Sequence, residues 1–268
     1  SQTLAAGLPV GAFVVAIVPL DSGVPTLLMS NSDFPALKLS SGNKVFMLQV
    51  AVQSAVGISG HAVECNDANL WLDRQKIFGN DVAIYANNCT LRLRRTVIFS
   101  NNGGGLQIEG ADPVKANLFL ENSFLTENNG DTFGGLRLGG SASAKILYST
   151  IALNSSIVPP IDCGPGWSGK LELRNSAVVD AGAHFGPGCN GKEVKTNTYE
   201  ELVSDKNLLK GTTFGGFTEG VYSALENGKL MDQALWKAGD PVADYDDTPR
   251  PTKANPALDY AGADRPAM

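Results

Sequence analysis

Residues 118–128 read LFLENSFLTEN, and the same pattern recurs at 70–80, 91–101, 144–154 and 171–181. The fifth residues of these stretches are Arg74, Arg95, Asn122, Tyr148 and Asn175, which follow one another at spacings of 21, 27, 26 and 27 residues. Two columns of the alignment are wholly aliphatic: Leu72, Leu93, Leu120, Ile146 and Leu173 in one, and Ile77, Ile98, Leu125, Ile151 and Val178 in the other. A repeat of this length built on short strands predicts a solenoid.

The last column of the alignment is Asn80, Asn101, Asn128 and Asn154, followed by Ala181 in the fifth copy. Asparagine tolerates the left-handed backbone conformation, and its amide can hydrogen-bond to an identical amide one layer above or below. We therefore predict a turn with stacked asparagines at this column.

Apolar and polar residues alternate with a period of two within each stretch, as in Leu91 and Leu93 against Arg92 and Arg94, which indicates strands. A second strand is expected after each asparagine, at 82–84, 106–108 and 136–138. No amphipathic helical stretch of useful length lies between them. The sequence thus predicts an all-β fold, a parallel β-helix (solenoid) with 21–28-residue coils, right-handed because that hand dominates parallel crossovers.

The repeat fades near Thr196. We expect residues 1–195 to form the β-helix and residues 196–268 to form an irregular C-terminal capping segment packed on it, within one structural domain. An open end of a β-helix exposes apolar core and unpaired strand edges, so a terminal unit has to cover it.

The composition excludes several classes of partner. A formal net charge of −6 argues against binding nucleic acid or an anionic membrane surface. The most apolar segment, 11–20, is about half the length of a membrane span and lacks the basic residues that precede a signal-peptide core. We interpret it as an early strand, with any secretion signal already removed.

The four cysteines fall into pairs separated by about one coil, Cys65 with Cys89 and Cys163 with Cys189. Residues one coil apart lie at nearly the same place on successive rungs, within disulfide distance. We predict these two disulfides, which indicate an extracellular, cell-surface or periplasmic location. Buried free thiols and a cysteine-rich metal site are the alternatives, although no CxxC pair or neighbouring histidine supports a metal.

The C-terminal residues carry a family resemblance. Residues 234–241 read ALWKAGDP, residues 244–251 read DYDDTPRP, and residues 259–264 read DYAGAD. This segment resembles the end of bacterial secreted right-handed β-helix proteins of the choice-of-anchor Q type, which have a pectate-lyase-like fold. The resemblance implies architecture and surface delivery, and it brings no catalytic signature.

Asp244, Asp246 and Asp247 are hard oxygen ligands at close spacing and are candidates for calcium, the one cofactor considered. The stretch fails the EF-hand pattern, with Pro249 where glycine is needed. Structural capping by these aspartates is the alternative, so no metal site is assigned.

The outward side of the repeated strand is where we expect any ligand to bind. One outward column contains Trp71, Arg92, Phe119, Lys145 and Glu172, and the next contains Asp73, Arg94, Glu121, Leu147 and Arg174. The residues Arg92, Arg94, Glu121, Lys145 and Glu172 are candidates for acid–base chemistry of the kind that β-helical lyases and hydrolases perform. Alternatively, opposite charges on neighbouring rungs, such as Asp73 with Arg94 and Arg94 with Glu121, form a solvated ladder.

Trp71, Phe119 and Trp167 are candidates for stacking on sugar rings, with core or loop packing as the alternative. The two histidines, His61 and His184, are far apart in sequence and have no nucleophile motif beside them, so a structural or surface role is expected for each.

Two functions remain open. The first is a secreted or cell-surface protein without enzymatic activity, acting as an adhesin, a matrix component or a carbohydrate-binding module whose partner is a polysaccharide or cell-surface glycan. The second is a polysaccharide-active enzyme of the lyase type. We favour the first, because the sequence links this chain to sugar chemistry only through its fold, and a fold alone does not imply an enzymatic function.

Overall fold

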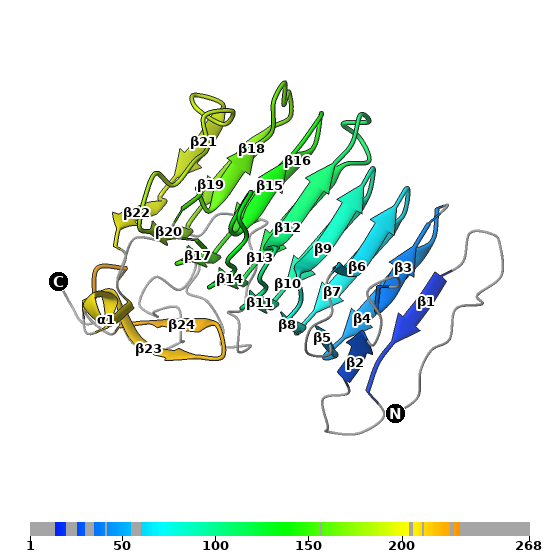
Figure 1. Cartoon of the computed structure of the whole chain (residues 1–268), viewed down its shortest axis with the longest axis horizontal. Helices are drawn as coiled ribbons and strands as arrows, with labels where there is room; N and C mark the ends of the chain where they lie inside the picture. Colours follow the sequence, from blue (N-terminus) through cyan, green and yellow to red (C-terminus); the bar gives the residue numbers. More distant parts are fainter. Residues whose placement is uncertain are drawn as a thin grey trace, which may run out of the picture.

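The computed structural model shows a parallel β-solenoid of about six turns with almost no helix, which confirms the predicted fold class (Figure 1). The structure describes residues 14–19, 26–29, 35–40, 42–54, 60–155, 157–203, 206–210, 212–225 and 228–230. The right hand of the coil stays a prediction.

Successive strands enter three parallel sheets in turn. Sheet 1 contains β1 (Val14–Ile17), β4 (Lys44–Leu48), β7 (Asn69–Asp73), β10 (Thr90–Arg94), β13 (Asn117–Glu121), β16 (Ser143–Leu147), β19 (Leu171–Arg174) and β21 (Glu193–Thr196). Sheet 2 contains β2 (Thr26–Met29), β5 (Ala51–Ser54), β8 (Lys76–Phe78), β11 (Val97–Phe99), β14 (Phe124–Thr126), β17 (Thr150–Ala152), β20 (Ala177–Asp180) and β22 (Tyr199–Leu202). Sheet 3 contains β3 (Leu37–Leu39), β6 (His61–Asn66), β9 (Val82–Asn87), β12 (Gly104–Glu109), β15 (Leu136–Leu138) and β18 (Ile161–Cys163).

Both predicted aliphatic columns line the interior. In sheet 1, Leu93 pairs with Leu72 on one side and Leu120 on the other, and in sheet 2 Ile98 pairs with Ile77 and Leu125. Every member of the two columns is at most 2 % exposed. Full burial of one such side chain stabilises the fold by about 1.5–3 kcal/mol, so both columns contribute substantially to its stability.

At the corner between sheets 1 and 2, the residue at the fifth position of the repeat adopts the left-handed backbone conformation. Arg74, Arg95, Asn122, Tyr148 and Asn175 have φ between 49° and 55°. At the asparagine corner, between sheets 2 and 3, the left-handed residues are Gly79, Ser100, Glu127 and Leu153. The asparagines therefore follow the left-handed residue instead of adopting that conformation themselves, which corrects the backbone part of the prediction.

The predicted stack of asparagines is confirmed. The Nδ2 atoms of Asn80, Asn101 and Asn128 donate to the Oδ1 atom of the next asparagine at 2.9, 2.8 and 2.9 Å. In the fifth copy the aligned residue is Ala181, but the backbone N–H of Asn154 donates to Asp180 Oδ2 at 2.9 Å. Asp180 is 1 % exposed, and burial raises the pKa of its carboxyl despite several backbone donors.

A second polar ladder lies one residue after the corner between sheets 1 and 2. The N–H groups of Thr96, Ser123 and Ser149 donate to the hydroxyl of the next coil, on Ser123, Ser149 and Ser176, at 3.1, 3.2 and 3.3 Å. Each of these four residues is buried, so the hydroxyls satisfy backbone groups that would otherwise be desolvated without partners.

Both predicted disulfides are present, Cys65–Cys89 and Cys163–Cys189, with Cα separations of 6.1 and 5.1 Å. The prediction assumed that the two cysteines of a pair occupy equivalent positions on successive rungs, but they do not. The strand partner of Cys65 is Ala86, so Cys89 lies three residues further on, in the turn that leads into β10. Each bond thus joins a strand of sheet 3 to the turn of the following coil, because the turn residues come within reach across the corner.

The last rung replaces aliphatic side chains with charges. Glu193 and Lys195 in β21 continue the inward columns of Leu171 and Leu173, and Glu200 in β22 continues the column of Val178. Lys195 Nζ lies 2.8 Å from Glu200 Oε1. Inward-pointing charges at the end of a sheet oppose edge-to-edge association. Within the described residues this rung ends the core, on both sides of the predicted boundary at 195.

After β22 the chain crosses the outward side of sheet 2. Helix α1 (Lys206–Leu209) and the antiparallel hairpin β23 (Phe214–Thr218) and β24 (Val221–Ala224) lie there, across the strands of the solenoid (Figure 1). Leu209, Phe214 and Tyr222 pack with Ala152 and Val179 in one buried cluster. This described part of the C-terminal segment covers a side of the solenoid. No described helix is long and apolar enough to cross a membrane.

Candidate functional site

The outward columns predicted on the repeated strand are in register on sheet 1. Arg92 pairs with Trp71 and Phe119, and Phe119 in turn pairs with Lys145, which pairs with Glu172. Because parallel strands lie about 4.8 Å apart, these side chains form a regular row along the solenoid. Residue Phe46 extends the row beyond Trp71 and was not among the sequence candidates.

The side chains of this row are partly apolar and partly exposed to solvent. Phe46 is 38 % exposed, and Arg92 is also exposed, while Trp71 and Phe119 are partly exposed. The guanidinium carbon of Arg92 lies 4.5 Å from the centroid of the Phe119 ring, a cation–π arrangement that orients both side chains. The row therefore presents flat aromatic and guanidinium surfaces on a rigid sheet.

The second outward column is paired differently from the prediction. Arg94 is the strand neighbour of Asp73 and Glu121, but the ion pair of Asp73 is made by Arg95, whose Nε donates to Asp73 Oδ1 at 2.8 Å. Arg95 sits at the left-handed corner one coil on and reaches back over Asp73. Among the described residues, Arg94 Nε is buried without a hydrogen-bond partner. Arg94 therefore lies between Asp73 and Glu121 as predicted, but within the described residues no ion pair joins it to either carboxylate.

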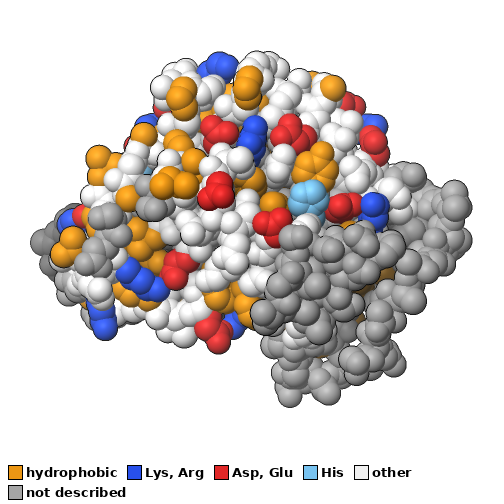
Figure 2. All heavy atoms as spheres, viewed as in Figure 1, with side chains coloured by type: hydrophobic (Ala, Val, Ile, Leu, Met, Phe, Trp, Pro, Cys, Tyr) orange, Lys and Arg blue, Asp and Glu red, His pale blue; other side chains and the backbone are white. Residues whose placement is uncertain are grey.

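The acid–base candidates are not drawn together into one cluster. Arg92, Arg94, Glu121, Lys145 and Glu172 lie on four successive rungs, from β10 to β19. Within the described chain, no hydrogen bond or ion pair joins any two of them. Figure 2 presents a different face, the outward side of sheet 3, where side chains of both charge signs are interspersed as well. On sheet 1 the five candidates are spread in the same way. Such an arrangement suits contact with an extended ligand better than concerted proton transfer, which needs groups within hydrogen-bond reach.

Trp167 belongs to the core. Its side chain is 2 % exposed, and its Nε1 donates to the carbonyl of Ala142 at 2.7 Å. The ammonium of Lys192 lies 5.4 Å from the ring centroid and donates to the carbonyl of Trp167 at 2.8 Å. The ring is thus enclosed and presents no free face to a sugar. The packing alternative holds for this residue.

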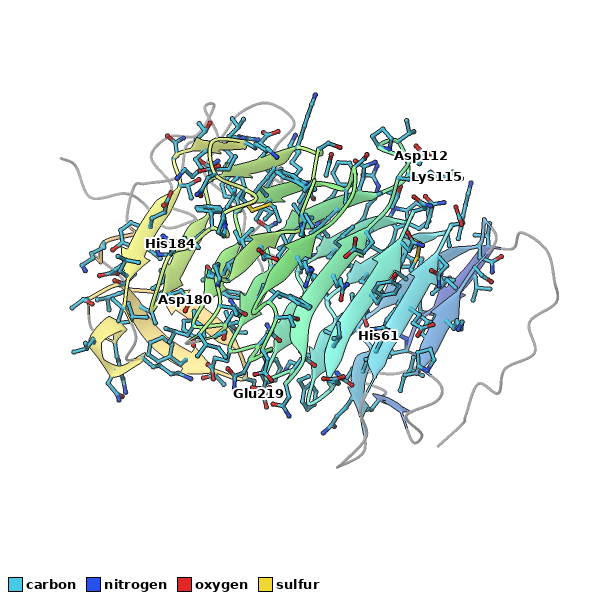
Figure 3. All side chains as sticks on the ribbon, turned by 45° about the horizontal axis from the view of Figure 1, so that its top comes forward. His61, Asp112, Lys115, Asp180, His184 and Glu219 are labelled. Atoms are coloured by element: carbon cyan, nitrogen blue, oxygen red, sulfur yellow. A yellow bond between two sulfur atoms is a disulfide. The ribbon has the colours of Figure 1, made fainter. Side chains whose placement is uncertain are left out.

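The two histidines lie at opposite ends of the described solenoid, as Figure 3 shows. His184 is 8 % exposed, with Nε2 2.9 Å from the carbonyl oxygen of Glu201 and Nδ1 3.4 Å from Glu200 Oε2. It is part of the charged last rung. His61 lies on sheet 3 and cannot act together with His184.

The calcium candidates Asp244, Asp246 and Asp247 lie outside the described residues, as does the rest of the motif that carries the family resemblance. Within the described part of the chain, no group of three or more His, Cys, Asp or Glu side chains is arranged to hold a metal ion.

Comparison of the chain with protein-family models, with curated proteins and with solved structures finds no match. The function of this chain is therefore inferred from its fold and from the side chains that the fold exposes.

Proposed function

We propose that this chain is a secreted or cell-surface β-solenoid that binds an extended glycan along the outward side of sheet 1, without enzymatic activity. The observation that carries the proposal is the row Phe46, Trp71, Arg92 and Phe119, which is in register on four successive strands and partly exposed. Aromatic faces with polar neighbours on a rigid scaffold suit stacking against the apolar face of a sugar ring.

The spacing of the row supports an extended ligand. Successive rungs are about 4.8 Å apart, so Trp71 and Phe119 stand roughly 10 Å apart with Arg92 between them. An extended polysaccharide also presents its rings at regular intervals along a line. A row of this kind can therefore contact several sugar rings at once, and weak individual contacts add up.

Two further observations support the location. Both pairs of cysteines are joined as disulfides, which form and persist in oxidising compartments such as the cell exterior or a periplasm. The C-terminal resemblance to bacterial choice-of-anchor Q proteins points the same way, and we include membership of that type in the proposal. The role is then that of an adhesin, a matrix component or a carbohydrate-binding module.

The experiment is a glycan array probed with the full chain, run beside an assay for unsaturated products on acidic polysaccharides. We expect binding to at least one extended polysaccharide and no product formation. Unsaturated products would replace this proposal with the lyase function, in which an Arg or Lys side chain of sheet 1 acts as the base. Failure to bind any glycan on the array would contradict the proposal.

A further inference from the structure

The outward side of sheet 3 carries a stacked pair of rings. The imidazole of His61 at the start of β6 and the phenol ring of Tyr85 in β9 have centroids 4.8 Å apart and planes inclined by 15°. Both residues are partly exposed. His61 lies in the N-terminal half of the solenoid, away from Asp180 and His184 (Figure 3). The two rings therefore pack face to face, and the pair is separate from sheet 1.

The imidazole is held in place by its neighbours. His61 Nδ1 lies 3.3 Å from Glu64 Oε1, and Lys38 Nζ lies 2.9 Å from Glu64 Oε2. Burial by itself raises the pKa of Glu64, but the hydrogen bonds and charges of Lys38 and His61 hold that pKa below its ordinary value. Glu64 is thus ionised and anchors the imidazole, so that little side-chain ordering is left for a ligand to impose.

Polar side chains with unused hydrogen-bonding capacity surround the rings. Tyr85 is flanked in register by Glu64 and Gln107, and the outward position two residues further along the strands holds Asn66, Asn87 and Glu109. Gln107 Nε2 lies 3.2 Å from Glu109 Oε1. Within the described chain, neither the Tyr85 hydroxyl nor the side-chain amides of Asn66 and Asn87 have a hydrogen-bond partner.

We propose that His61, Tyr85, Asn66, Asn87 and Glu109, here called the sheet 3 patch, bind an uncharged sugar ring. The part of the stacked rings that stays exposed offers an apolar surface for the C–H face of the sugar. The amides and the Glu109 carboxylate supply donors and acceptors for its hydroxyl groups, and hydrogen bonds to a carboxylate are stronger than those between neutral groups. The proposal does not depend on glycan binding by sheet 1.

The charges around the patch favour an uncharged ligand. Burial, then the charges of Glu109 and Glu64, raise the pKa of Tyr85, which reflects a negative potential at the phenol. An anionic sugar would meet that potential and be repelled. The strongest attraction for a cation, at Glu64, is already taken up by Lys38 and His61. A neutral, polyhydroxylated ring is not repelled by this potential and does not need a free carboxylate to pair with.

The test is titration calorimetry of the full chain with cellohexaose and laminarihexaose as neutral probes and polygalacturonate as an anionic probe. We expect a neutral probe to bind and Tyr85→Ala to weaken that binding roughly tenfold, about 1.4 kcal/mol, because the variant loses the stacked ring. Tyr85→Phe keeps the ring and is expected to stay within roughly threefold of the unmodified chain. Phe78→Ala, an outward aromatic change on sheet 2, is the matched control and should leave the affinity unchanged. Phe119→Ala, on sheet 1, is run beside it to show whether a neutral probe binds there instead.

Asn87→Ala is a second variant, for use if Tyr85→Ala fails to fold. The side chain of Asn87 is partly exposed and its loss removes no aromatic ring, so this variant should fold and should also bind the probe more weakly. The proposal is overturned if no neutral probe binds at millimolar concentration, or if neither Tyr85→Ala nor Asn87→Ala changes the affinity. Tetramethylammonium is a cationic probe for the same rings, and its binding in place of the sugars would also overturn the proposal. Loss of neutral binding in Phe119→Ala alone would place the ligand on sheet 1, overturning this inference while supporting the proposed function.

Discussion

Sheets 1 and 2 share one core and have eight strands each, yet their outward sides differ. The outward side of sheet 2 is covered by α1 and the β23–β24 hairpin, where Phe214 and Tyr222 are at most 2 % exposed. Among the described elements, none packs across sheet 1 in the way that β24 packs on β14. A cover within the chain therefore accounts for apolar side chains on sheet 2, whereas no described element accounts for the aromatic row on sheet 1.

Polar contacts fasten the cover to sheet 2. The Tyr222 hydroxyl and the Lys206 ammonium both donate to Glu127 Oε1, at 2.7 and 2.6 Å. Burial, followed by the hydrogen bond to Glu127, raises the pKa of Tyr222. Lys229 is paired with Glu201, and Lys76 of β8 is paired with Glu219 at the hairpin tip. Aromatic residues that stabilise this chain are thus buried under its own described elements, and the partly exposed aromatic residues of sheet 1 need another explanation.

The largest effect is expected in the core that both sheets share. Leu120→Asp places a charge in the middle of an aliphatic column with no partner, and an uncompensated buried charge costs several kcal/mol. We expect no folded protein, as judged by circular dichroism and thermal unfolding. A soluble variant with an unchanged melting curve would contradict the assigned register.

The next effect separates the two outward sides directly. Phe214→Ala removes a fully buried ring from the cover and should lower the free energy of unfolding by about 3–5 kcal/mol. The matched change Phe119→Ala, on the open row, loses mainly the contact with Arg92 and should cost about 1 kcal/mol or less. Denaturant unfolding of both variants measures the difference. Equal losses would show that sheet 1 is covered as sheet 2 is.

A smaller effect, dependent on pH, is expected beneath the covered side at Asp180. Burial raises the folded-state pKa of this carboxyl above its ordinary value of 3.8. The native state therefore holds the proton more tightly, so this contribution to stability is present below about pH 3.8 and is lost as the pH rises through the folded pKa. Asp180→Asn, which continues the asparagine ladder, should be more stable than the unmodified chain at neutral pH.

Urea unfolding of both proteins at acidic and neutral pH checks this prediction, with Asn128→Asp as the matched reverse change, expected to destabilise at neutral pH. If the gap between the unmodified chain and Asp180→Asn does not widen towards neutral pH, the sign assigned to Asp180 is wrong.

The smallest effect on stability is expected for Arg92→Ala combined with Arg94→Ala on sheet 1. Surface charges of this kind contribute about 0–1 kcal/mol, so the melting temperature should stay nearly unchanged. Glycan binding should weaken, because the row loses the guanidinium between Trp71 and Phe119. Surface plasmon resonance on the glycan found by the array measures this, and unchanged binding would remove these two residues from the site.

The sequence predicted those features that every rung repeats. The aliphatic columns and the asparagine stack recur because each coil places the same position in the same environment. Features set by a single coil were not predictable in this way. Asp180 takes over from the missing fifth asparagine because its side chain reaches the backbone of Asn154 from one position earlier. The spacing also could not show that the ring of Trp167 turns inward from its loop.

Pairing across corners was equally hard to predict. Alternation places Arg94 beside Asp73, but it says nothing about the left-handed corner from which Arg95 takes that carboxylate. The cover on sheet 2 left only a weak signal, since a hairpin between Phe214 and Ala224 has no repeat to identify it. The row on sheet 1 was predicted in register, and Phe46 was missed because its coil lies before the aligned stretches.

The affinity of Trp71→Ala for the best glycan on the array tests most directly whether the aromatic row of sheet 1, which no described element covers, binds glycan. Phe78→Ala is the control, since Phe78 is an outward aromatic residue of sheet 2 that stacks on Phe99 with centroids 5.1 Å apart. We expect Trp71→Ala to bind roughly tenfold more weakly and Phe78→Ala to bind with unchanged affinity. Equal affinity of Trp71→Ala and the unmodified chain would contradict this expectation.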